Sequence, residues 1–285
     1  MVLDPRWEAL LNPGRATSFF ALPHAGQFEP EATAYSPVNA WWLAELSRLI
    51  YKQEKDEVAD FQGHTRRELL NAAGLEEVRF IRRPLAQCAV VQPSDPAAPP
   101  FAVLVFRGSY ELRSWLTNLQ SRPVEWRPHP GRVHQGFKDA LECVVEEIDA
   151  VLGGVAGPVF YTGHSLGAAL ATLAAAWKPP RAVYAFGSPR VGDQEFLQTL
   201  GQTKLYRVVN SRDVVPTLPP AQFGFAHGGE LRYITREGKI LVAPAEDPRE
   251  PRRFFEPQLL EGAPPEDLAD HAPLDYVTRL RAVLP

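Results

Sequence analysis

Hydrophobic residues follow two spacings along this chain, one typical of buried strands and the other of helices. Short, almost wholly apolar runs favour strands covered on both faces. They recur at 101–107, 158–162, 182–186 and 205–209. The clearest helical spacing between them is the stripe Phe137, Ala140, Leu141, Val144, Val145, Ile148 and Val151. This alternation predicts an α/β fold with a central, mostly parallel sheet and helices on both faces.

The flanking segments add further elements. Residues 1–35 are rich in proline and predict loops. Ser36 before Pro37 marks a helix start, and the apolar face predicts a helix to about Lys55. A capping box begun by Thr65 opens a second helix that ends at Gly74. Further predictions are strands at 78–82 and 87–92, a helix at 194–200, a hairpin of 231–235 with 239–243, and a final helix at 273–283.

Composition excludes several classes of protein. No linker or repeat divides the 285 residues, so one domain over 1–285 is expected, with residues 1–100 supplying N-terminal helices and first strands and 101–285 the core. A net charge of −4 without a basic run makes nucleic acid an unexpected partner. Cys88 and Cys143 lack metal-ligand spacing and are expected to be free thiols.

Targeting signals are not evident in the sequence. The N-terminus has no pattern of a signal peptide, which predicts a cytoplasmic protein unless a secretion signal was removed. No run of eighteen apolar residues exists, so no transmembrane segment is expected. The oligomeric state stays open.

Candidate chemistry centres on Ser165. It lies in the sequence G-H-S-L-G at 163–167, between a strand-like run and an alanine-rich helical run. A serine on a sharp strand-to-helix turn has strained backbone angles and an exposed hydroxyl, and it needs small neighbours such as Gly163 and Gly167. This context favours a nucleophile over an ordinary buried serine.

A serine hydroxyl needs a base, and the base needs an orienting acid. On this type of fold the acid and then the histidine follow the serine along the chain. Asp213, just after the strand at 205–209, is the better-placed acid, and Asp193 is the alternative, although it also suits a helix cap. Of the two later histidines, His271 suits the base, whereas His227 suits a half-buried structural role. Asp270 is expected to be solvated.

An oxyanion hole needs two hydrogen-bond donors. The N–H of Leu166 follows the nucleophile directly, and Ser109 follows the strand at 101–107. Gly108 would allow close approach of the main chain, although a plain turn explains this segment equally well. His164 is expected only to pack, and His134 only to begin a helix. The chemistry needs no metal or other cofactor.

Several motifs together resemble the class 3, fungal-type lipases. They are V-F-R-G-S at 105–109, V-H-Q-G-F at 133–137, T-G-H-S-L-G at 162–167, F-G-S-P-R-V-G-D at 186–193, N-S-R-D-V-V-P-T-L-P-P at 210–220 and D-H at 270–271. The resemblance implies an α/β-hydrolase fold and hydrolysis of lipid esters at a lipid–water interface. It places the nucleophile on Ser165, the acid on Asp213 and the base on His271.

The same resemblance implies oxyanion donors at Ser109 and Leu166. The sequence departs from the family at Ala168, where a second glycine is usual, and in lacking cysteines for several disulfides. We expect a triacylglycerol lipase whose acyl groove is lined by Val214, Val215, Leu218 and Pro219. A phospholipase A1, a monoacylglycerol lipase or a feruloyl-type esterase is the alternative on this fold, and a lipid-binding protein on an inactive scaffold is the alternative in another class.

The segment after Ser109 carries the last expectation. Leu112, Trp115, Leu116 and Leu119 form one apolar face of a short helix. Taken by itself, this apolar face indicates a surface helix, but the resemblance to the family implies a lid over the active site. Activity should then rise sharply when a short-chain triglyceride passes its solubility limit, and Trp115→Ala should blunt that rise. Identical smooth saturation of both proteins would show that this helix is not a lid.

Overall fold

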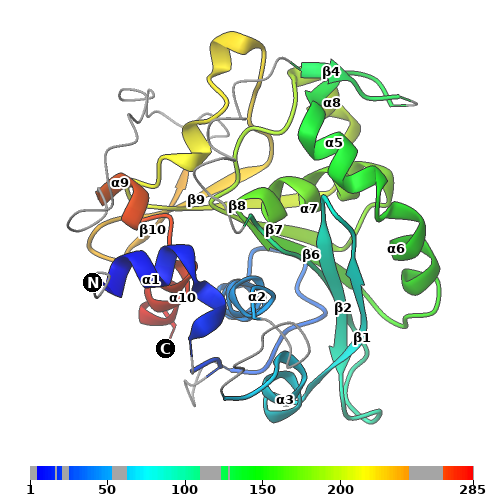
Figure 1. The fold of residues 1–285 in the computed structure, drawn as a ribbon, viewed down its shortest axis with the longest axis vertical. Coiled ribbons are helices and arrows are strands. Elements are labelled where there is room, and N and C mark those ends of the chain that lie inside the picture. Colours follow the sequence, from blue (N-terminus) through cyan, green and yellow to red (C-terminus); the bar gives the residue numbers. More distant parts are fainter. Residues whose placement is uncertain are drawn as a thin grey trace.

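The computed structural model describes residues 5–16, 18–20, 26–52, 63–109, 123–127, 129–243 and 266–284. These residues contain an eight-stranded sheet in the order β1-β2-β3-β6-β7-β8-β9-β10. Neighbouring strands from β3 to β9 run parallel, while β1, β2 and β10 are joined antiparallel at the two edges. The mostly parallel sheet predicted from the sequence is therefore confirmed (Figure 1).

Most of the strand and helix bounds are close to those expected. The strands are β1 (Leu75–Arg82), β2 (Gln87–Pro93), β3 (Ala102–Phe106), β6 (Val159–His164), β7 (Ala182–Phe186), β8 (Lys204–Asn210), β9 (Glu230–Ile234) and β10 (Ile240–Ala243), with β4 (Pro123–Glu125) and β5 (Arg132–His134) in a separate pair. The helices are α1 (Pro5–Leu11), α2 (Pro37–Leu49), α3 (Arg66–Ala72), α5 (Gln135–Glu142), α6 (Val145–Leu152), α7 (Leu166–Trp177), α8 (Gln194–Thr199), α9 (Glu266–Ala269) and α10 (Pro273–Ala282).

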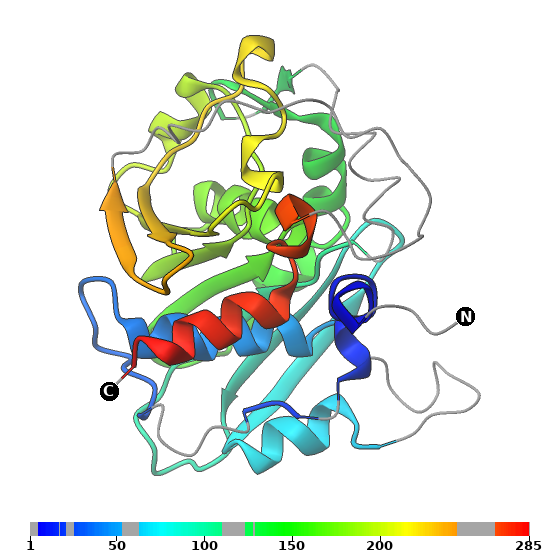
Figure 2. The same cartoon turned by 90° about the vertical axis from the view of Figure 1, so that its left-hand side faces the viewer.

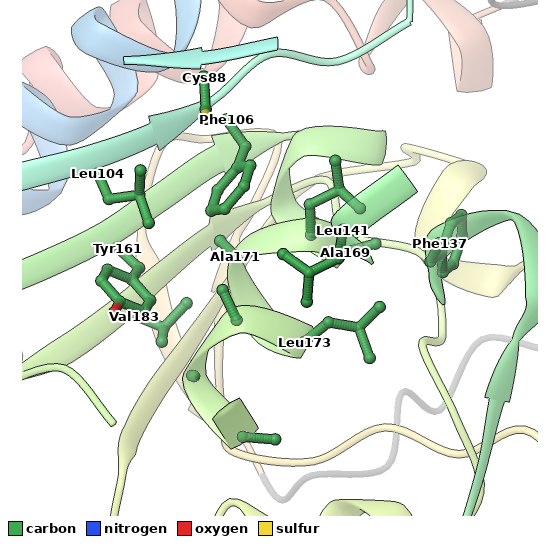
Figure 3. Close-up of a cluster of buried hydrophobic side chains, with 14 of the residues drawn as sticks. Cys88, Leu104, Phe106, Phe137, Leu141, Tyr161, Ala169, Ala171, Leu173 and Val183 are labelled. Carbon is green, nitrogen blue, oxygen red and sulfur yellow. The ribbon is translucent and has the colours of Figure 1, made fainter. Parts of the chain in front are cut away.

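Helices cover both faces of the sheet. On one face, α2 and α10 pack against each other and against the strands (Figures 1 and 2). On the other, α5, α6 and α7 share a core with alternate residues of the same strands (Figure 3). Leu104 and Phe106 point to this second face, while Val103 and Val105 point to the first. A continuous apolar run is therefore needed in β3, because both of its faces are buried.

The helix α7 is almost wholly buried. The helix contacts β6, β3 and α5, and its small residues Ala169 and Ala171 lie with Leu173 in the core that α7 shares with the sheet (Figure 3). Alanine also has the highest intrinsic helix propensity, so the local preference and the packing agree. The buried helix thus supports the turn that carries Ser165, directly before Leu166, the first residue of α7.

Two predictions of helix extent were nevertheless wrong. The helix after Ser36 ends at Leu49 and not near Lys55, because the chain turns at Ile50. The stripe from Phe137 is split into α5 and α6, because buried Val144 leaves helical backbone angles with φ at −125°.

An unpredicted helix, α1, lies in the N-terminal segment that was expected to be loops. It begins at Pro5 and buries Trp7 and Leu10 against Leu268 and Ala272. Proline at a first helical position is a known start signal, so the sequence did carry a hint of this helix.

Both cysteines are free, as expected, with Cys88 buried and Cys143 partly buried. Burial raises the pKa of the Cys88 thiol. No helix in the described ranges has the length and hydrophobicity that a bilayer span requires.

Candidate active site

Ser165 occupies a strained turn between β6 and α7. Its backbone angles are φ 60° and ψ −124°, a region that non-glycine residues rarely adopt. A Cβ on Gly163 would lie 2.8 Å from the backbone nitrogen of Ala168, and one on Gly167 would lie 3.0 Å from the carbonyl carbon of Arg107. Both glycines therefore allow main-chain contacts that a side chain would block. This is the turn predicted for a nucleophile.

Asp213 and His271 form a buried pair. The Nδ1 atom of His271 lies 2.9 and 2.8 Å from the two carboxylate oxygens of Asp213. The side chains are 0% and 1% exposed. The Tyr276 hydroxyl donates to Asp213 at 2.5 Å, and the Val215 N–H donates at 2.9 Å. The carboxylate thus receives hydrogen bonds that offset its loss of water and fix the plane of the imidazole.

The loops that carry these two residues are joined to each other. The Asn210 amide donates to the Asp270 main-chain oxygen at 2.8 Å, and the Arg212 N–H donates to the Asp270 carboxylate at 2.9 Å. The Val214 N–H donates to the Asp267 oxygen at 3.0 Å. The acid and base are 58 positions apart in sequence, so these bonds hold them in one place.

Backbone contacts bring Ser165 to the same place. Its N–H donates to the Phe186 oxygen at 2.9 Å, which places it beside Gly187. A Cβ on Gly187 would lie 2.8 Å from an Asp213 carboxylate oxygen and 3.0 Å from the His271 ring. Ser165 Oγ and His271 Nε2 are both buried, and neither has a hydrogen-bond partner among the described residues. Such contacts are often long before substrate binds.

The two candidate oxyanion donors lie on neighbouring segments. Leu166 begins α7, so its N–H is one of those that the helix does not use internally. Ser109 is half-buried and follows β3, whose last residue, Phe106, pairs with Gly163 at the end of β6. A Cβ on Gly108 would lie 2.7 Å from the His164 oxygen, so glycine permits this approach. The arrangement can stabilise a negative oxygen beside Ser165.

Comparison with known proteins agrees with this geometry. The family model "Lipase (class 3)" matches residues 103–223. A lipase of Rhizomucor miehei is 40% identical over 149 residues, which are 46% of this chain and 41% of that protein. A secreted mono- and diacylglycerol lipase of Fusarium solani is 40% identical over 137 residues, which are 44% of this chain and 41% of that protein.

Solved structures extend the match. The triacylglyceride lipase of Rhizomucor miehei superimposes with a TM-score of 0.53 and 32% identity, over 59% of this chain and 70% of that chain. This chain belongs to the class 3 lipase family. A triacylglycerol lipase described as having a serine protease triad as its catalytic centre matches with a TM-score of 0.59 and 28% identity, over 72% of this chain and 82% of that chain.

Membership of the class 3 lipase family confirms the expected α/β-hydrolase fold. The chain spans less than half the length of the curated relatives that it matches. The activity of the whole protein is therefore treated below as a proposal.

The alternative residues in this member of the class 3 lipase family lie outside the site. Asp193 caps α8, since its carboxylate accepts from the Phe196 N–H at 2.9 Å. The imidazole of His227 bonds to the Pro216 main-chain oxygen at 2.7 Å, as expected for a structural histidine. The structure thus joins Asp213 to His271 and brings in neither alternative. The candidate lid residues Leu112, Trp115 and Leu116 lie outside the described residues.

The structure bears on two further sequence interpretations near the site, and the one for Asp270 was wrong. Val215 is 0% exposed and Val214 packs against the cluster of Trp7 and Leu10, while the acyl groove expected there stays a prediction. Asp270 is not solvated, since its side chain is 14% exposed and lies 3.5 Å from the Arg279 guanidinium.

His164 is the site residue whose role the sequence concealed. It packs as expected, with its ring centroid 4.4 Å from that of His271, but it also hydrogen-bonds on both sides. Burial, and the charge of His271, lower the pKa of His164 well below its usual value of 6.5. His164 is therefore neutral at neutral pH.

The depressed pKa of His164 predicts a pH-dependent stability. In the unfolded chain this histidine takes up a proton as pH falls below about 6.5, but in the folded chain it does not. Lowering the pH from about 7.5 to about 5.5 should therefore cost the wild type about 1.4 kcal/mol through this group, and a His164→Gln variant should escape that loss. Urea unfolding of both proteins at the two pH values measures the difference. Equal losses would show that His164 titrates normally in the folded state.

Proposed function

We propose that this chain is a serine ester hydrolase that cleaves long-chain acylglycerols, as a triacylglycerol lipase does. The observation that carries the proposal is the strained Ser165, which lies beside the buried pair of Asp213 and His271. The class 3 lipase relatives support the substrate class, since they include triacylglyceride lipases and mono- and diacylglycerol lipases.

Acylation starts at Ser165. Its Oγ attacks the ester carbonyl while His271 Nε2 takes the hydroxyl proton, and the same imidazolium then protonates the leaving glycerol oxygen. The strained turn holds the Ser165 hydroxyl outside α7, at the N-terminal end of that helix. The first N–H groups of α7 point toward this end. The acyl group remains on Ser165 as an ester.

Asp213 orients the base and stabilises its charged form. It accepts from His271 Nδ1, which leaves Nε2 as the proton acceptor in the neutral ring. The N–H of Leu166 and the N–H and hydroxyl of Ser109 stabilise the oxyanion of the tetrahedral intermediate. Water, activated by the same imidazole, then releases the fatty acid, and no cofactor takes part.

Covalent labelling tests this function directly. A long-chain p-nitrophenyl phosphonate should add once to the wild type and release one equivalent of p-nitrophenol, while Ser165→Ala should not react. Peptide mass spectrometry should locate the adduct on Ser165. An unlabelled wild type that still binds fatty acid would instead support a lipid-binding protein on an inactive scaffold.

Relative rates identify the substrate class. We expect triolein and diolein to be hydrolysed faster than phosphatidylcholine or a feruloyl ester, at equal interfacial area. Faster release from phosphatidylcholine would assign a phospholipase, and a preference for feruloyl esters or for monoolein would assign the corresponding esterase or monoacylglycerol lipase.

A further inference from the structure

Beneath His271, the neutral imidazole of His164 makes two directional hydrogen bonds. Its Nε2 lies 2.8 Å from the main-chain oxygen of His271, and its Nδ1 lies 3.3 Å from the Tyr51 hydroxyl. A carbonyl oxygen only accepts, so Nε2 carries the proton and Nδ1 accepts from Tyr51. The ring is wholly buried and neutral, which suits this single tautomer.

The bond to His271 links the base to the nucleophile. His164 directly precedes Ser165, so any shift of its ring moves the strained turn and the His271 main chain together. On the other side, the His271 N–H donates to the Leu268 oxygen at 3.1 Å. The main chain of the base is thus held at its oxygen by β6 and at its nitrogen by α9.

Tyr51 extends the same network to the oxyanion loop. It follows the C-terminus of α2 and is 4% exposed. Its hydroxyl occupies the space that a Cβ on Gly108 would fill, and its ring carbon Cζ lies 3.0 Å from that position. Gly108 therefore lets the Tyr51 hydroxyl lie against the main chain that leads to Ser109.

We propose that Tyr51 and His164 are positioning residues that hold the oxyanion loop, the nucleophile turn and the base loop in one catalytic geometry. The network touches the main chain of all three segments, and the His164 ring packs on the His271 ring without a hydrogen bond to its Nε2 atom. This role rests on the proposed ester hydrolase function. It predicts losses in kcat with little change in KM, because the network orients groups that act in the transition state.

Removal of one hydroxyl tests the role of Tyr51. Tyr51→Phe should lower kcat by about 10- to 100-fold on a dissolved p-nitrophenyl ester, with KM within about twofold of the wild type. Tyr35→Phe is the matched control, since the Tyr35 hydroxyl is also buried, has no partner among the described residues, and lies in an aromatic cluster with Tyr184 and Tyr206. Equal kcat in the two variants and the wild type would overturn the proposal.

A pair of variants tests the donor on His164. Glutamine and leucine have similar size, but only glutamine can donate to the His271 oxygen. His164→Gln should retain at least about tenfold more kcat than His164→Leu, if the bond orients the base. Equal kcat in two folded variants would show that His164 acts by packing alone.

A spectroscopic measurement separates this proposal from the proposed function. Nitrogen-15 shifts of the histidine rings should show His164 as the neutral Nε2–H tautomer from pH 8 to pH 5.5, and Tyr51→Phe should shift only its Nδ1 signal. An Nδ1–H tautomer, or no response to Tyr51→Phe, would overturn the network even in an active enzyme. A wild type without ester hydrolysis or phosphonate labelling, but with these spectra, would overturn the function and leave the network standing.

Discussion

Asp213→Asn is expected to leave a folded protein whose ester hydrolysis is slower by about 10⁴. An asparagine can offer its amide N–H to His271 Nδ1, which would move the ring proton to Nε2 and remove the acceptor that Ser165 needs. The asparagine oxygen can still accept from the Tyr276 hydroxyl, so the loop that carries residue 213 should stay joined to α10. The loss should appear in kcat, measured on a dissolved p-nitrophenyl ester.

Companion variants show whether the three residues act as a unit. Ser165→Ala should abolish turnover. His271→Ala alone should lower kcat about as much as His271→Ala combined with Asp213→Asn, because the effects of triad residues are strongly non-additive. His227→Ala is the matched control for the histidine, since its ring bonds to Pro216 away from the site. Loss of activity in His227→Ala with retention in His271→Ala would move the base to His227.

The nucleophile turn was predictable because its determinants are local. A strand-forming run, two glycines and an alanine-rich run all lie within about 20 residues, and each acts on its neighbours. The same holds for the caps of α2 and α8, where Ser36 and Asp193 bond to the N–H three positions ahead. These features need no knowledge of distant contacts.

The support of the acid and base was not predictable, because it depends on residues far apart in the chain. Tyr276 reaches Asp213 across 63 positions, and Tyr51 reaches His164 across 113. In the sequence these tyrosines are indistinguishable from other half-apolar residues of α10 and of the end of α2. Only the fold shows that both lie under the site.

Hydrophobicity alone does not decide the role of the residues after Asp213. Val214 and Val215 are apolar, and an acyl groove and a protein core both favour such residues. In the structure Val214 packs against α1 and Val215 is fully buried. Asp270 was misjudged on its charge, since a charged residue near a helix start was expected in water, yet it joins the acid and base loops.

Ser109→Ala is expected to lower kcat by about 10²–10³, or about 3–4 kcal/mol of transition-state stabilisation, with little change in KM. The substitution keeps the main-chain N–H and removes only the hydroxyl. Gly108, packed under the Tyr51 hydroxyl, fixes the main chain that carries Ser109, so the loop should hold its place without that hydroxyl. The loss would therefore report a hydrogen bond to the oxyanion.

Ser109→Thr separates that bond from general damage to the loop. Threonine restores a hydroxyl on the same carbon, so it should recover most of the lost kcat, whereas both variants should unfold within about 0.5 kcal/mol of the wild type in urea. Phosphonate labelling of Ser165, whose adduct imitates the oxyanion, should slow in parallel with kcat in the alanine variant. If Ser109→Ala keeps the wild-type kcat, the hydroxyl does not reach the oxyanion, and Ser109 contributes only its main-chain N–H beside that of Leu166.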